Sequence, residues 1–164
     1  MGLARSVVDI DAPIGRVWQV MLDMDRYGEW NPFVVRIDRK CTGEPELGED
    51  FTLNVRWHNG KGVATHERIS RLDAPCRAAD GVQRAVLEYD FLGPLAALGA
   101  VRGRRLQLVE QSGGTVTRYT TEETLHGWLA WAAPLKWVQD GFERHAAALK
   151  RRCEALEAQA TARA

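Results

Sequence analysis

The stretch IDAPIGRVWQVMLDMDRYGEWNPF, residues 10–33, carries the clearest structural signals in the chain. Asp11 can cap a helix, and Pro13 fits the first helical turn because a proline there removes no helical hydrogen bond. Apolar residues then recur at helical spacing as far as Met21. The pattern predicts an amphipathic helix of about three turns that ends near Asp23.

The chain leaves this stretch in an extended conformation, because Gly28 weakens a second, shorter helix or turn and Pro32 must end it. Segments typical of β-strands follow, with glycine-containing turns between them. After Pro134 an apolar stripe at helical spacing predicts a helix of about five turns or more. The expected order is one strand, two helices, six strands and a long helix, an α+β chain. The predicted strands cover residues 3–10, 33–40, 50–58, 61–72, 84–91, 102–111 and 115–125.

Length and composition favour one ordinary globular domain. The 164 residues are 45% hydrophobic and 27% charged, and 22 Lys and Arg balance 22 Asp and Glu. We therefore expect a single domain over residues 1–160, with 161–164 frayed, and no nucleic-acid partner. No apolar run approaches the length of a membrane span, which argues against an integral membrane protein. Three widely spaced cysteines predict neither a disulfide framework nor a zinc cluster, and favour the cytoplasm.

The segments IDAP (10–13), VW (17–18) and YGEWNPF (27–33) resemble the N-terminal signature of bacterial polyketide cyclase/dehydrase-like (SRPBCC) proteins. Residues 114–127 resemble the last strand and exit turn of the same branch, which belongs to the helix-grip superfamily with the START domains and the pollen-allergen proteins. The resemblance implies a curved antiparallel sheet of about seven strands (β-α-α-β6-α) around the C-terminal helix, with an internal cavity. Members of the superfamily differ in chemistry, so the scaffold alone does not fix the function.

A sheet that curves around one helix leaves a cavity unless side chains fill it, and ligand cavities usually measure about 300–1,000 Å³. Leaving about 300 Å³ empty would cost roughly 7 kcal/mol, which is comparable with the whole stability of a domain. A persistent cavity therefore indicates a ligand. Because residues two apart on a strand share a face, the apolar alternation predicts which side chains point inward. The predicted ligand-binding residues are Phe51, Leu53, Val55, Trp57, Leu87, Phe91 and Leu125 from strands, Val138, Gly141 and Phe142 from the last helix, and Trp30, Asn31, Phe33 and Arg104.

Four of the expected inward-facing residues could carry chemistry. Burial of Glu67 or Glu123 in an apolar cavity would raise the pKa of the carboxyl and make it a usable general acid or base. The alternatives are a pair with an arginine such as Arg104, or a strand phase that leaves both acids in solvent. Tyr89 and Tyr119 could donate hydrogen bonds to a ligand carbonyl, or could simply pack in the core.

The remaining candidates have both a functional and a structural interpretation. Arg104 could bind a ligand carboxylate or lie in solvent, and Trp30 and Asn31 could line the cavity or shape the corner between helix and strand. Gly141 could admit a ligand or a neighbouring loop into the last helix. His66 begins an HExxH-like pattern that Ser70 breaks, so we expect no metal site and no cofactor.

Two segments of the sequence are apolar: residues 91–99 lie between two predicted strands, and residues 128–134 lead into the last helix. They could close the mouth of the predicted cavity as a lid, or form the surface of a homodimer. The leading hypothesis is a protein that binds a polyketide-, lipid- or aromatic-like hydrophobic molecule without cofactors. The alternatives are a polyketide cyclase, aromatase or dehydratase that uses a cavity carboxylate and a tyrosine, and a chaperone-associated or stress-related interaction protein.

Overall fold

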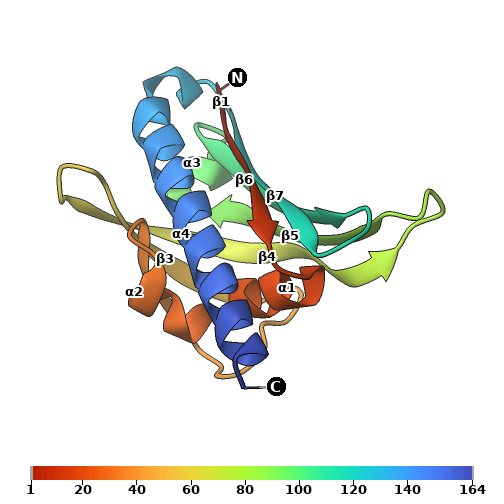
Figure 1. Cartoon of the computed structure of the whole chain (residues 1–164). Coiled ribbons are helices and arrows are strands. Elements are labelled where there is room, and N and C mark those ends of the chain that lie inside the picture. The colour runs from red at the N-terminus through yellow and green to blue at the C-terminus, as the bar shows by residue number, and fades with distance from the viewer. Residues whose placement is uncertain (1, 164) are drawn as a thin grey trace.

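The computed structural model describes residues 2–163 and contains one seven-stranded antiparallel sheet in the order β1-β7-β6-β5-β4-β3-β2. The sheet curves around a long C-terminal helix (Figure 1), so the predicted α+β helix-grip architecture is confirmed. The strands are β1 (Gly2–Asp11), β2 (Val34–Arg39), β3 (Asp50–Arg56), β4 (Gly62–Arg77), β5 (Gln83–Leu92), β6 (Arg102–Gln111) and β7 (Val116–His126). The helices are α1 (Ile14–Leu22), α2 (Tyr27–Trp30), α3 (Pro94–Ala97) and α4 (Leu135–Thr161), with 3-10 turns at Met24–Arg26 and Ala130–Ala132.

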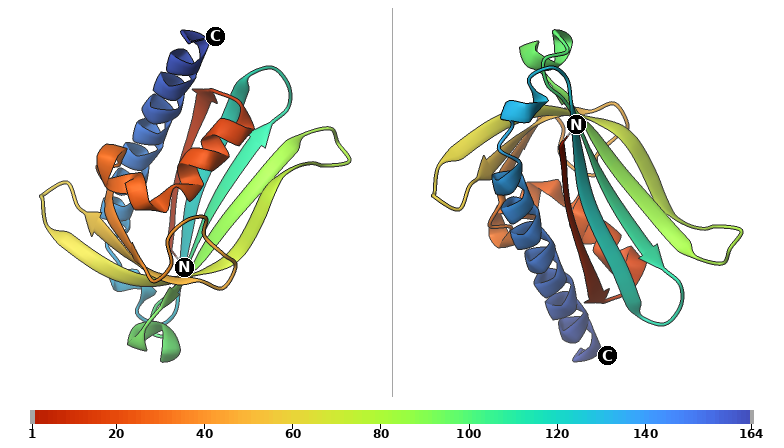
Figure 2. Two further views of the ribbon diagram at one scale, coloured as in Figure 1. Left: turned by 90° about the horizontal axis from the view of Figure 1, so that it is seen from below. Right: turned by 90° about the horizontal axis from the view of Figure 1, so that it is seen from above.

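Helices occupy both ends of the concave side of the sheet. Figure 2 shows α4 along that side, with α1 and α2 beside its C-terminal half. Arg16 of α1 bonds Glu157 of α4, and Glu29 of α2 bonds Arg152, which agrees with this placement. The short helix α3 lies at the opposite end of the fold, near the start of α4 (Figure 1). Helices α1 and α2 therefore pack against the sheet and α4 at one end of the fold.

The predicted amphipathic helix α1 buries its apolar stripe, but its N-terminus differs from the prediction. Pro13 precedes the helix, and no side chain of the preceding residues caps it. Instead the Ile14 backbone N–H donates to Gln111 Oε1 of β6 over 3.0 Å. Asp11 accepts a hydrogen bond from Thr115 Oγ1, so a long-range contact replaces the expected local cap.

The predicted short second helix or turn is a 3-10 turn followed by a single α-helical turn. Two features differ from the sequence-based expectation: β4 continues to Arg77, and a short helix α3 forms within the apolar segment 91–99. Of the residues expected to fray, Thr161 ends α4 and Ala164 lies outside the described residues. Among the described residues no helix combines the length and apolar character needed to span a bilayer.

Candidate functional site

A cavity of about 470 Å³ lies between the sheet and the first half of α4. Its lining is mainly apolar and comes from strands β3 to β7, from α4, and from the loops around α3 and before α4. A wider hollow elsewhere, over Asn54–Arg56 and Gly60–Ala64, mixes charged side chains with exposed backbone and is a weaker candidate for an apolar ligand. The predicted ligand-binding residues that line the inner cavity are Phe33, Leu53, Val55, Trp57, Phe91, Leu125, Val138 and Phe142.

The two apolar segments predicted as lid or dimer surface meet at one end of this cavity. Leu95 of α3 and Leu129 both line it, as do residues 132–134. The Leu129 backbone N–H donates to the Ala100 carbonyl oxygen over 2.9 Å, which joins the two segments. We call residues 93–101 and 127–134 the mouth segments. Their most exposed apolar side chains are Leu98, Trp128 and Trp131, which are 74%, 68% and 82% exposed.

Cross-strand register places a row of polar side chains on the inner face of the sheet. Arg105 of β6 lies opposite Tyr89 of β5 and Glu123 of β7, while Glu67 of β4 lies opposite Phe91. Directly opposed residues share a face, with Cβ atoms about 4.5–5.5 Å apart. Glu67, Arg105 and Glu123 all form part of the cavity wall. The strand alternation therefore placed both acids on the inner face, as predicted.

The two cavity acids have raised pKa values. Each carboxyl keeps part of its surface accessible within the cavity, but protein atoms enclose it. Loss of hydration is the main cause, and the nearby Glu123 charge adds to it, so that the pKa of Glu67 rises to about 8. Burial likewise raises the pKa of Glu123, against the opposing effect of the Arg105 charge. At neutral pH Glu67 is therefore mostly protonated and can donate a hydrogen bond.

Arg105 is the charged residue of the cavity wall that the sequence analysis missed. It is 6% exposed, its guanidinium carbon lies 4.6 Å from the centre of the Phe142 ring, and its Nε donates to Thr121 Oγ1 over 3.3 Å. Its Nη2 is buried without a hydrogen-bond partner among the described residues. Arg104, the predicted ligand-binding arginine, points to the outer face and pairs with Asp90 over 2.8 Å. Deciding which alternate residues of β6 face inward would have distinguished Arg105 from Arg104. The buried alternating set is Gly103, Arg105, Gln107 and Val109.

Beneath the cavity, Asn31 connects the turn before β2 to α4. Its Oδ1 accepts the backbone N–H groups of Phe33 and Val34 over 3.0 Å each. This fixes the orientation of the amide, so Nδ2 donates to His145 Nδ1 at 2.6 Å. Asn31 therefore acts at the corner and does not line the cavity, which agrees with the structural alternative.

The same buried chain continues to the sheet. His145 must carry its proton on Nε2, because Nδ1 accepts from Asn31, and it donates to Tyr119 Oη over 2.9 Å. The Tyr119 hydroxyl in turn donates to Gln107 Oε1 over 2.7 Å. Burial lowers the pKa of His145 well below its usual value, and burial raises the pKa of Tyr119. Tyr119 is thus committed to a neutral structural network and lies outside the cavity wall.

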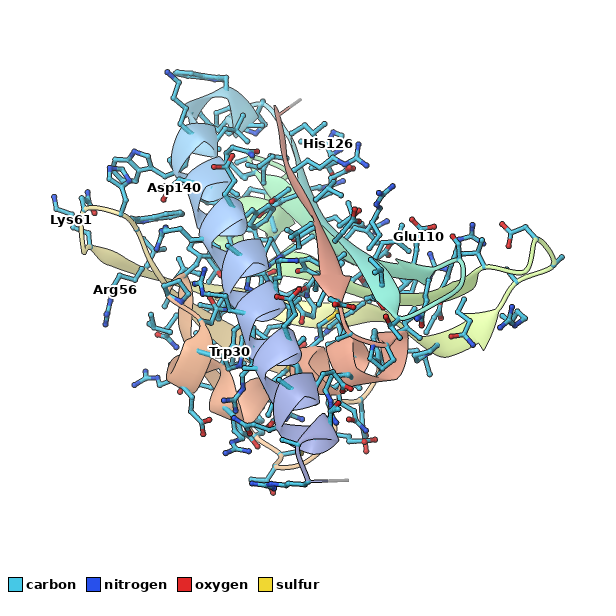
Figure 3. The ribbon with its side chains drawn as sticks, viewed as in Figure 1. Trp30, Arg56, Lys61, Glu110, His126 and Asp140 are labelled. Carbon is cyan, nitrogen blue, oxygen red and sulfur yellow. The ribbon has the colours of Figure 1, made fainter. Side chains whose placement is uncertain are left out.

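Five other predicted site residues also lie outside the cavity wall. Phe51, Leu87 and Tyr89 are buried in the core, where the rings of Phe51 and Tyr89 pack edge to face at 4.9 Å. The Phe33 ring fills the space over Gly141. The glycine therefore makes room for a neighbouring side chain and not for a ligand. Trp30 lies beside α4, away from the mouth segments (Figure 3), with its ring 5.8 Å from that of His145. The described residues contain no group of three or more His, Cys, Asp or Glu side chains arranged to hold a metal ion.

Comparison with known proteins identifies the scaffold. A family model described as polyketide cyclase / dehydrase and lipid transport matches residues 1–154. No curated protein sequence matches the chain.

Solved structures share the fold at low sequence identity. A Thermobifida fusca protein is 19% identical with a TM-score of 0.67, covering 96% of both chains. A Thalictrum norcoclaurine synthase, solved with a transition-state analogue, is 12% identical with a TM-score of 0.65, covering 95% of this chain and 96% of its own. The di-domain ARO/CYC protein StfQ of steffimycin biosynthesis is 12% identical with a TM-score of 0.62, covering 93% of this chain and 45% of its own. At these identities the similarity establishes the fold alone.

Proposed function

Since this chain belongs to the polyketide cyclase / dehydrase and lipid transport family, we propose that it binds one hydrophobic small molecule in the cavity between the sheet and α4. Family membership supports a role in binding a hydrophobic ligand. We further propose that the ligand is a polyketide-, lipid- or aromatic-like molecule and that the protein binds it without catalysis.

The observation that carries the proposal is the size and lining of the cavity. An enclosed, dry cavity of 470 Å³ would cost roughly 11 kcal/mol at about 24 cal/mol per Å³, and this value is an upper bound here because the cavity opens to solvent. Whole domains are stable by only about 5–15 kcal/mol. An apolar space of this size is expensive to maintain unless a ligand or ordered water fills it. The mainly apolar lining favours an apolar ligand over water.

Fluorescence titration with the neutral apolar probe N-phenyl-1-naphthylamine tests the proposal. Val138→Phe places a larger side chain on the α4 wall of the cavity, and we expect probe affinity to fall roughly tenfold or more while the protein stays folded. Val7→Phe makes the same change at an exposed position of β1 and should leave binding unchanged. Equal probe affinity in both variants would contradict binding at this site. Independently of the probe titration, native mass spectrometry of the purified protein would identify any compound that it retains.

A second candidate function is acid–base catalysis on a polyketide-like substrate. The specific observation in its favour is the pKa of about 8 at Glu67, because a group that titrates near neutral pH can both release and accept protons. Under this hypothesis the Glu67→Gln and Glu123→Gln variants lose turnover of a poly-β-ketone substrate but keep their affinity for the neutral probe. Glu122→Gln, which changes a β7 acid beside Arg5, is the control. Full turnover in both cavity variants would exclude these acids as catalysts.

A further inference from the structure

We propose that the ligand carries an anionic oxygen group, such as a carboxylate or an enolate, and that this group pairs with Arg105. The inference rests on the proposed function, because it assigns the chemical class of the molecule held in the same cavity. It adds a polar, charged end to a ligand that the lining alone describes as hydrophobic.

The Arg105 side chain has an incomplete hydrogen-bonding environment. A guanidinium has five N–H donors and remains charged at every physiological pH. Among the described residues the Arg105 side chain donates one hydrogen bond, to Thr121, and the neutral Tyr119 hydroxyl lies near the guanidinium, but Nη2 is buried with no acceptor. The Phe142 ring on one side offers a cation–π contact but no lone pair. Buried charged groups are ordinarily paired, so this arginine lacks a partner that a ligand can supply.

The described residues also provide no direct counter-ion for Arg105. Most arginines of the described chain, Arg104 included, form a salt bridge within 4.0 Å, whereas Arg105 forms none. The two acids nearest in the sheet register, Glu67 and Glu123, do not approach it within that distance. The Glu123 Oε1 atom instead lies over Gly103, 3.2 Å from where a Cβ would stand, toward the mouth end of β6.

The position of the Arg105 charge within the cavity also favours an anionic ligand group. Arg105 is part of the wall that Glu67, Glu123 and Phe142 also form. A ligand group seated against that wall lies beside the guanidinium, and an anionic oxygen there completes both its hydrogen bonding and its charge. Protonated Glu67 can donate a hydrogen bond to the same group, whereas ionised Glu67 would repel it. A neutral ketone or alcohol would satisfy a donor but would give the guanidinium no ion-pair partner within direct contact.

Two probes with the same aromatic frame test the inference. 8-Anilino-1-naphthalenesulfonate carries an anionic group, and N-phenyl-1-naphthylamine does not. We expect Arg105→Met to weaken binding of the anionic probe roughly tenfold or more, with little loss for the neutral probe. Arg104→Met removes the neighbouring charge on the outer face and should change neither affinity. Equal losses for both probes in Arg105→Met, or no loss for either, would overturn the inference.

If Arg105→Met does not fold, a competition experiment on the unaltered protein tests the same inference. We expect 2-naphthoate to displace the neutral probe at a lower concentration than its methyl ester does, although the ester is the more hydrophobic molecule. Displacement by the ester at the same or a lower concentration would overturn the anionic assignment while leaving the cavity proposal intact. Failure of the neutral probe to bind at all would instead overturn the proposed function, and the present inference with it.

Discussion

Glu67 couples the stability of the protein to pH. Its pKa is about 8 in the folded protein and 4.5 in an ordinary environment, so the folded state binds the proton more tightly than the unfolded chain. Between these values the unfolded chain holds fewer protons, and stability must fall as the pH rises. Below about 4.5 the carboxyl is protonated in both states and its contribution no longer depends on pH.

Glu67→Gln should remove this pH dependence. Integrated over the window from 4.5 to about 8, the cost of ionising Glu67 is at most about 5 kcal/mol, and less where water enters the cavity. We therefore expect the variant to gain stability over the unaltered protein as the pH rises from 5 to 9, measured by urea unfolding. Glu122→Gln, the outer-face control, should show no such gain. A constant difference between Glu67→Gln and the unaltered protein across this range would contradict the assignment.

At the scale of single residues, sequence alternation identified Glu67 and Glu123 but misplaced other candidates. Arg104 and Arg105 are adjacent, and only the phase of β6 determines that Arg105 faces the cavity. Tyr119 lies on the inner face of the sheet, as predicted, yet its hydroxyl is hydrogen-bonded to Gln107 and His145. Those partners come from other elements of the chain. Such partners depend on tertiary packing, which local patterns do not encode.

At the scale of elements, α4 approaches the sheet closely where it carries a glycine. Gly141 faces the Phe33 ring, and a methyl group at Gly141 would stand only 2.6 Å from Phe33 Cζ. Phe33 in turn lines the cavity. The glycine costs about 1 kcal/mol of helix propensity relative to alanine, and close packing of the ring offsets that cost.

Gly141→Ala should therefore destabilise the protein, although it improves the helix locally. We expect a net loss of about 1–2 kcal/mol in chemical denaturation, since the overpacking penalty exceeds the propensity gain. Gly15→Ala in α1 is the matched control, because no atom lies within 4 Å of its added methyl group, and it should stabilise the protein by up to about 1 kcal/mol. Phe33→Leu in the Gly141→Ala background should recover part of the loss. Equal effects of the two glycine substitutions would contradict the packing argument.

Element order was predictable because it follows from local signals. The apolar spacing in residues 14–21 and the stripe after Pro134 each corresponded to a helix, and the alternating segments became strands. The N-terminus of α1 was not predictable in the same way. Its cap comes from Gln111, which is 97 residues away in the sequence, and only the folded arrangement brings that side chain near.

At the scale of the whole molecule, the curvature of the sheet around α4 leaves room for the cavity, and we expect the mouth segments at one end to control access to it. The family resemblance of the N-terminal motifs predicted this architecture, whereas the residues alone indicated only the order of strands and helices along the chain. The mouth depends on one close contact. Gly127 has φ of 117°, and a Cβ there would collide with the Ala100 carbonyl oxygen and lie 2.6 Å from that of Gly99.

Gly127→Ala should separate the mouth segments without removing any residue from the cavity wall. The added methyl group pushes against the backbone that accepts the Leu129 hydrogen bond, so we expect N-phenyl-1-naphthylamine to dissociate roughly tenfold faster in stopped-flow experiments. Gly81→Ala is the control, because φ there is 81° but no atom lies within 4 Å. It should carry the backbone strain of about 1–2 kcal/mol and leave the dissociation rate unchanged. If both variants release the probe at the rate of the unaltered protein, access does not depend on these segments, and the ligand must enter elsewhere along the sheet.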